Sequence, residues 1–70
     1  MDVFIKEYNA KVKTLEFVKK TYGKCNFGTV DSSYQYLLGY ANALYDCGLI
    51  TSNDLQKAFD ITEKLFEEFK

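Results

Sequence analysis

Apolar residues recur at the spacing of an α-helix along almost the whole chain, and no proline interrupts them. Single glycines, Gly23 and Gly48, follow the first two periodic stretches at places where a helix C-cap favours a left-handed residue. The length of 70 residues leaves room for one compact domain. We therefore predict an all-α fold: a single domain over residues 1–70, folded as an antiparallel three-helix bundle in up-down-up order, with helices over about 2–22, 33–47 and 52–69.

The two connections of this bundle are predicted to differ in length. The segment 24–30 has no period and contains Asn and Gly, so we expect a longer first connection with Phe27 and Val30 tucked beneath it. Ser32 and Gln35 have the spacing of a capping box, which predicts that the second helix begins near Ser33. The few residues that follow Gly48 predict a tight second turn.

Each predicted helix carries an apolar stripe for the core. The expected stripes are Phe4, Tyr8, Val12, Leu15 and Tyr22 in the first helix, Leu37, Ala41 and Leu44 in the second, and Leu55, Ala58, Phe59, Thr62, Leu65, Phe66 and Phe69 in the third. Further apolar residues flank the second stripe on both sides. Such a wide arc is typical of a helix that contacts more than one neighbour.

The residue types that most often carry catalysis are absent or isolated. There is no His to activate the thiol of Cys25 or Cys47, and no glycine-rich loop followed by the lysine that binds phosphate. The acidic residues of the third helix lie among polar positions, which is typical of a solvated face. We therefore expect no enzyme, no cofactor, no metal site, no small-molecule substrate and two free thiols.

The charges are distributed unevenly along the chain. Residues 1–24 carry six Lys and three acidic residues, a balance of +3, whereas residues 25–70 carry three Lys and seven acidic residues, a balance of −4. The net charge of −1 argues against a dedicated nucleic-acid binder. No apolar stretch is long enough for a membrane span, and the first residues lack the pattern of a signal peptide, so we expect no membrane partner and a cytoplasmic location.

Two surfaces are candidates for binding a partner. Lys6, Lys13 and Lys20 recur every seven residues and project on the outer face of the first helix, with Phe17 beside them. An apolar anchor with a cationic rim is typical of a helix that binds a protein surface. Tyr36 and Tyr40 form the second candidate, with packing against a neighbouring helix as the alternative.

Frequent Lys, Asn, Tyr, Phe and Ile, with no Arg, Pro, Trp or His, are expected of coding DNA that is rich in A and T. In size and composition the chain resembles short accessory proteins of phages and mobile elements, a group that includes anti-CRISPR proteins. The resemblance implies an inhibitor or regulator that occludes a surface of a host protein machine in the cytoplasm of a bacterial host cell. The alternatives are a self-associating structural or regulatory homodimer, joined through the tyrosines, and weak nucleic-acid binding through the lysine face.

Overall fold

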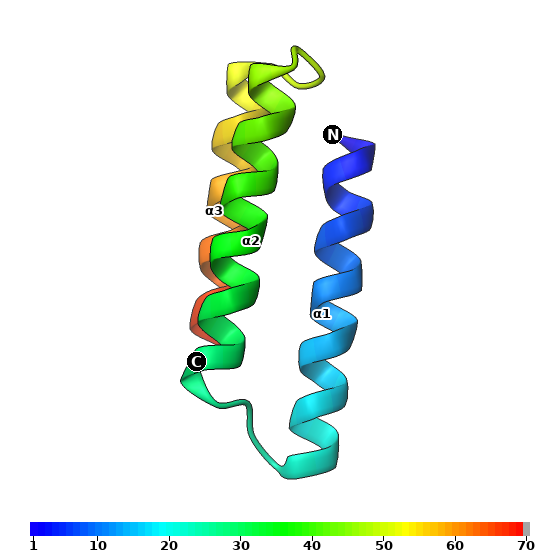
Figure 1. Cartoon of the computed structure of the whole chain (residues 1–70), viewed down its shortest axis with the longest axis vertical. Coiled ribbons are helices and arrows are strands. Elements are labelled where there is room, and N and C mark those ends of the chain that lie inside the picture. Colours follow the sequence, from blue (N-terminus) through cyan, green and yellow to red (C-terminus); the bar gives the residue numbers. More distant parts are fainter. Residues whose placement is uncertain (70) are drawn as a thin grey trace.

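Three antiparallel helices form an elongated bundle (Figure 1). The structure, a computed structural model, describes residues 1–69, and for Phe27 the backbone alone. Helix α1 spans Asp2–Tyr22, α2 spans Phe27–Asp46 and α3 spans Ser52–Phe69, within a body of 39 × 16 × 14 Å. The prediction of an all-α three-helix bundle is confirmed.

Helix α1 ends in a glycine C-cap, as the sequence predicts. Gly23 has a φ of 84°, and its N–H donates to the carbonyl of Lys19 at 2.8 Å. Lys19 and Lys20 lie in the last turn, where the helix dipole favours cations. Helix α1 therefore ends at the residue that the glycine predicts.

The first connection is shorter than the sequence suggested, and the prediction of a long one is wrong. It consists of residues 23–26, because α2 begins at Phe27 and not near Ser33. Asn26 is the N-cap, and its Oδ1 accepts from the Thr29 N–H at 2.8 Å and from the Thr29 hydroxyl at 3.0 Å. The Asn that reads as a turn residue thus starts the helix.

Two consequences follow for the segment that we expected to be a loop. Val30 is fully buried, but it lies in an early turn of α2 and not beneath a connection. Ser33 is also buried and lies inside the helix, so the capping-box spacing of Ser32 and Gln35 marks no helix start. The expected burial of the Phe27 side chain falls outside the described residues.

The second connection, residues 47–51, joins α2 to α3 through a glycine cap and a reciprocal pair of hydrogen bonds. Gly48 has a φ of 75°, and the Leu49 N–H donates to the Leu44 carbonyl at 2.9 Å. At the start of α3, the Thr51 N–H donates to Asp54 Oδ2 at 3.3 Å, and the Asp54 N–H donates to Thr51 Oγ1 at 3.1 Å. This connection is one residue longer than the first, so the prediction that the second turn is the shorter of the two is wrong.

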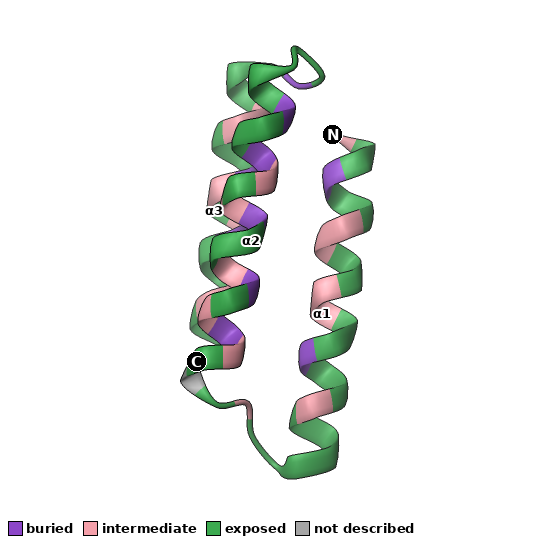
Figure 2. Ribbon diagram, in the orientation of Figure 1, coloured by how far each residue is buried: buried purple, intermediate pink, exposed green. Residues whose placement is uncertain are grey.

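All three helices contribute buried apolar residues to the core, and Figure 2 shows those of α1 and α2 on their facing sides. Its buried apolar members are Phe4, Leu15, Val30, Leu37, Ala41, Leu44, Ile50, Ala58, Leu65 and Phe69. Helix α1 supplies only the first two of these. Correspondingly, α2 and α3 pack against each other more extensively than α1 packs against either of them. The bundle is therefore a tight α2–α3 hairpin with a more lightly packed α1.

One residue of the predicted core stripe is exposed. Tyr22 is 74% exposed, although it lies 18 residues, or about five helical turns, after the fully buried Phe4 and so faces the same side of α1. The reason is visible in Figure 1, where the last turns of α1 extend beyond the start of α2 and the end of α3. Among the described residues, no helix lies opposite Tyr22 to cover it.

Candidate interaction surfaces

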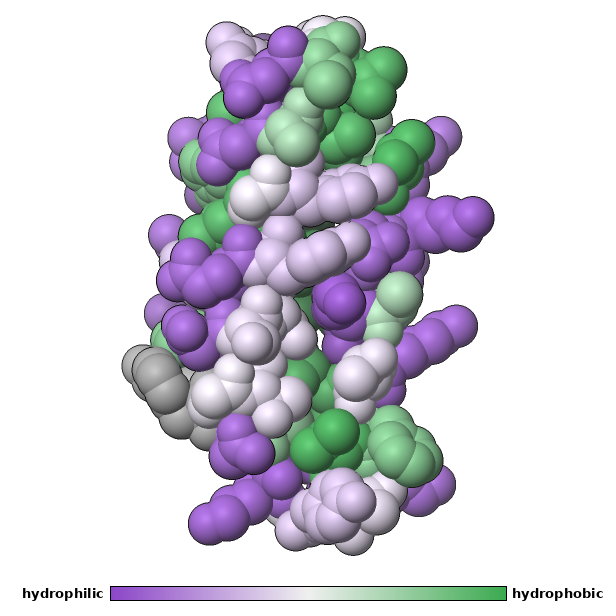
Figure 3. Space-filling view, viewed as in Figure 1, coloured by the Kyte–Doolittle hydropathy of each residue, from purple (hydrophilic) through white to green (hydrophobic). Residues whose placement is uncertain are grey.

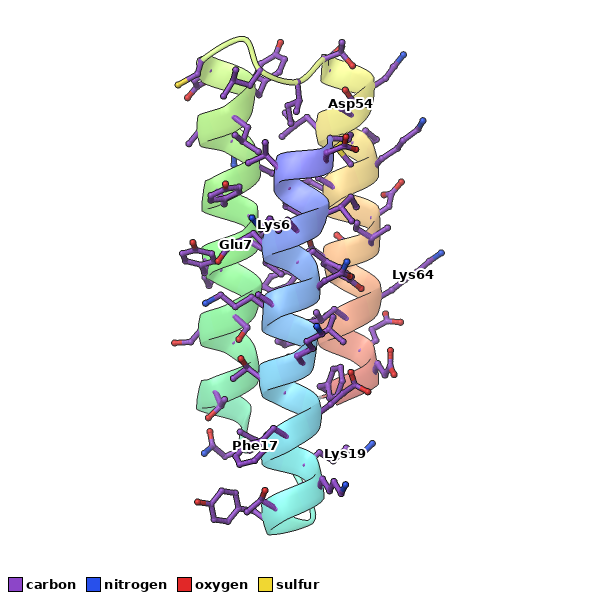
Figure 4. All side chains as sticks on the ribbon, turned by 90° about the vertical axis from the view of Figure 1, so that its right-hand side faces the viewer. Lys6, Glu7, Phe17, Lys19, Asp54 and Lys64 are labelled. Carbon is purple, nitrogen blue, oxygen red and sulfur yellow. The ribbon has the colours of Figure 1, made fainter. Side chains whose placement is uncertain are left out.

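Phe17 lies on the outer face of α1, near the level at which α2 begins (Figure 4). It is 66% exposed, and the lysines predicted to flank it, Lys6, Lys13 and Lys20, are exposed as well. Because seven residues span about two turns, these lysines follow one another at about 10.5 Å along the helix. Lys6 lies near the opposite end of α1, so Lys13 and Lys20 are the members of this row that flank the aromatic ring (Figure 4).

Tyr36 and Tyr40 are brought together, but they lie against α1. Their rings stack with centroids 5.9 Å apart, and the Tyr40 ring lies 6.5 Å from the ring of the buried Phe4. Lys11 of α1 places its Nζ 4.3 Å from the centroid of the Tyr36 ring. A hydrogen bond to the Glu7 carboxylate, with a smaller contribution from burial, raises the pKa of Tyr36 above its ordinary value of 10.0. These tyrosines therefore form part of the α1–α2 seam, with Tyr36 still 44% exposed.

The two predicted surfaces are separate. Tyr36 meets α1 at Glu7 and Lys11, and Phe17 lies six residues further along, about 9 Å along the helix axis. Tyr36 stacks on Tyr40 and contacts Lys11, whereas among the described residues no aromatic ring or ammonium group makes such a contact with Phe17. The structure thus leaves one aromatic side chain open and engages the other two within the fold.

A third feature, the overhanging end of α1, was not predicted from the sequence. We use this name for Phe17, Val18, Lys20 and Tyr22 of α1 together with Lys24, which follows them in the first connection. Between it and the start of α2 lies a shallow hollow of about 450 Å³, lined by Val18, Tyr22, Lys24, Asn26 and Thr29. Figure 3 shows hydrophobic and near-neutral side chains gathered at this end of the molecule. Helical periodicity assigned Tyr22 to the core, because periodicity gives the face of a residue but not the reach of its neighbours.

The other chemically active groups are dispersed. Cys25 is half-buried and its thiol donates to the Leu15 carbonyl at 3.2 Å, whereas Cys47 lies exposed beyond the far end of α2; both are free thiols. The acidic face of α3 forms a shallow depression of about 260 Å³ lined by Asp60, Glu63, Lys64 and Glu67. Within residues 1–69, no three Cys, Asp or Glu side chains are grouped as metal ligands.

No helix in the described part of the chain has the length and apolar character needed to cross a bilayer. Comparison with protein-family models, with curated proteins and with solved structures finds no match to this chain. The conclusions about function therefore depend on the surface itself.

Proposed function

We propose that this protein is a non-catalytic helical module that binds another protein and acts by covering part of its surface. The observation that carries the proposal is Phe17, an aromatic ring that is 66% exposed on a regular helix face between lysines. Full burial of a Phe side chain is worth about 1.5–3 kcal/mol, so a partner that covered this ring would recover about 1–2 kcal/mol from it. Aromatic anchors of this kind dominate the energetics of many protein interfaces.

The lysines add a second contribution to the same contact. Lys13 and Lys20 stand on the outer face of α1 and are exposed. Charges at the rim of an interface mainly raise the rate of association and suppress wrong partners, while the buried anchor supplies affinity. The combination suits a small protein that must find one surface and remain on it.

The biological use that we propose is inhibition or regulation of a host protein machine in the bacterial cytoplasm, in the manner of the phage and mobile-element proteins that the chain resembles in size and composition. An anti-defence role of the anti-CRISPR kind belongs to this class. Steric occlusion needs no active site, only a complementary surface. The exposed anchor on α1 is the feature that supports it.

A dimer through the tyrosines is less well supported, because Tyr36 and Tyr40 are already engaged with Phe4, Glu7 and Lys11. Nucleic-acid binding through the lysine row is a further alternative. The chain offers no Arg for reading bases, and the acidic face of α3 would repel the phosphate backbone.

The proposal is tested by affinity capture from the organism that carries the gene, using the full chain, Phe17→Asp and Leu49→Asp. Leu49 is a matched control, because it is also 66% exposed but lies in the second connection. We expect a protein that the full chain and Leu49→Asp retain and that Phe17→Asp loses, and a one-to-one complex with that purified protein by calorimetry. The proposal would be contradicted if Phe17→Asp captured the same proteins as the full chain, or if the purified chain turned over a substrate.

A further inference from the structure

The overhanging end of α1 is the place where the fold leaves an inward helix face uncovered. Tyr22 shares its side of the helix with Phe4, which is fully buried, yet 74% of Tyr22 is exposed. It is the most exposed large apolar side chain in the described part of the chain. Phe17, on the outer face, lies five residues before it. Two aromatic side chains therefore project from different faces of the same two turns.

The hollow beside Tyr22 gives this end a concave part. Val18 and Tyr22 supply its apolar wall from α1, and Asn26 and Thr29 supply the opposite wall from the start of α2. Asn26 Oδ1 already accepts two hydrogen bonds from Thr29, so the cap is satisfied within the chain. Small-molecule sites orient their ligands with several convergent polar groups. This hollow offers an apolar wall, one ammonium group and a polar wall whose Asn26 Oδ1 is already engaged, which suits an apolar side chain that protrudes from a protein.

Lysines are the charged residues of the segment that forms the overhang and the first connection. Residues 17–30 contain Lys19, Lys20 and Lys24 and no acidic residue. On the side toward α3, Glu16 and Glu68 share a depression with Lys19 and Lys20, and the Lys19 Nζ lies 5.8 Å from the centroid of the Phe69 ring. Lys24, in contrast, lines the hollow beside Tyr22. The carboxylates of Glu16 and Glu68 therefore lie on the α3 side of this end, and Lys24 supplies a positive charge at the hollow.

We infer that the overhanging end of α1 is the centre of the contact, with Tyr22 as a second anchor beside Phe17, and that it binds an acidic protein surface that places an apolar side chain in the hollow. This inference rests on the proposed function and specifies its site and the chemistry of the partner. Lys24 at the hollow attracts carboxylates at the rim, and Lys64 of the acidic face of α3 points to the opposite side of the molecule from Phe17 (Figure 4). The two rings and the hollow bury the apolar part of the contact.

The position of the contact is tested by photo-crosslinking in the organism that carries the gene. Benzoylphenylalanine replaces Phe17, Tyr22, Tyr36 or Leu49, one position at a time, in the full chain. We expect crosslinks to one protein from positions 17 and 22 and not from 36 or 49. Crosslinks to one protein from position 17 but not from 22 overturn this inference and leave the proposed function standing, whereas crosslinks from 36 or 49 but not from 17 overturn both. Crosslinks to no protein from any position overturn both.

The chemistry of the partner is tested with the crosslinked protein after purification. We expect the crosslinked peptide to lie on an acidic surface, and Tyr22→Ser and Lys24→Glu each to weaken binding at least tenfold, with the loss on Lys24→Glu shrinking as salt is raised. Leu49→Ser and Lys64→Glu are the matched controls and should stay within twofold of the unchanged chain. Equal losses in the controls, or tighter binding by Lys24→Glu, overturn the inference.

Two other classes of macromolecule could be drawn to a cationic aromatic surface, and each has a defined probe. The full chain is titrated with a 16-base-pair DNA duplex and with vesicles that contain phosphatidylserine. We expect neither to bind at micromolar protein concentration in 0.15 M salt. Binding of either probe that is lost in Lys24→Glu would assign the surface to nucleic acid or to a lipid surface and overturn the inference.

Discussion

Helix α1 and the α2–α3 hairpin are both amphipathic, but they differ in how many buried residues they contribute to the core. The hairpin supplies eight of the ten buried apolar residues, if Ile50 of its turn is included, and α1 supplies Phe4 and Leu15. Helix α1 also extends past the hairpin and leaves Tyr22 uncovered (Figure 1). The part of the molecule that contributes least to the core thus carries the two most exposed aromatic side chains of the described residues, Phe17 and Tyr22. A binding surface costs the fold least at this place.

The largest expected effect comes from shortening core side chains, two in the hairpin and one in α1. Leu37→Ala and Leu65→Ala remove fully buried side chains within the hairpin, and we expect each to lower the free energy of unfolding by about 3–5 kcal/mol. Leu15→Ala should cost less, about 2–3 kcal/mol, because the more lightly packed α1 can settle into the space. Urea unfolding followed by circular dichroism measures all three. A larger loss for Leu15→Ala than for the hairpin variants would break the comparison.

Glycine substitutions sharpen the comparison by testing the turns apart from the packing. Gly23 and Gly48 both have positive φ and open space around the position of a Cβ atom, so Gly23→Ala and Gly48→Ala should each cost about 1–2 kcal/mol through backbone strain. Gly39→Ala, inside α2 and also facing open space, should instead stabilise the protein by about 0.5–1 kcal/mol. Thermal unfolding measures the three changes. Unequal costs at positions 23 and 48 would indicate that the turns contribute to the difference between the two regions.

The smallest expected effect is a dependence on alkaline pH at the seam of α1. Burial, with a smaller contribution from Glu68, raises the pKa of Tyr8, and the hydrogen bond to Glu7, with burial second, raises the pKa of Tyr36. The folded protein therefore holds these phenolic protons more tightly than the unfolded chain does. The stabilisation is complete below the ordinary pKa of 10.0 and is lost as the pH rises through the higher values of the folded protein.

This dependence is checked by urea unfolding between pH 8 and pH 11. We expect the free energy of unfolding to fall above about pH 10, and to fall less in Tyr36→Phe, which has no phenolic proton to lose. Tyr45→Phe is the control, because Tyr45 is on the same helix and almost equally exposed. An unchanged pH dependence in Tyr36→Phe would show that the Glu7–Tyr36 contact does not hold α1 to the hairpin.

The architecture was predictable because most of its signals are local. The apolar periods gave three helices, and the positive-φ glycines closed the first two close to where the sequence indicated. The start of α2 was not predictable in the same way, because Asn26 and Gly28 suit a loop as well as a first helical turn. Asn26 acts as a cap because the helix continues through Val30, which the core fully buries.

The candidate surfaces were predictable only in part. The pattern of α1 placed Phe17 and its lysines outside the apolar stripe, and the structure leaves that ring open. For Tyr36 and Tyr40 the pattern allowed either an open face or packing against a neighbour, and contacts with Lys11 and Phe4 place them in the seam. Such a choice depends on residues that are distant in the sequence.

By itself, the sequence determined the helical content, two helix ends and the side of each helix that is apolar, because these follow from backbone conformation and from the 3.6-residue period. The tertiary structure alone decided which apolar residues are covered. Phe4 and Tyr22 occupy the same side of α1, and one is buried while the other is open. The difference arises because burial requires another helix at the same level along the axis, and the hairpin ends before α1 does (Figure 1).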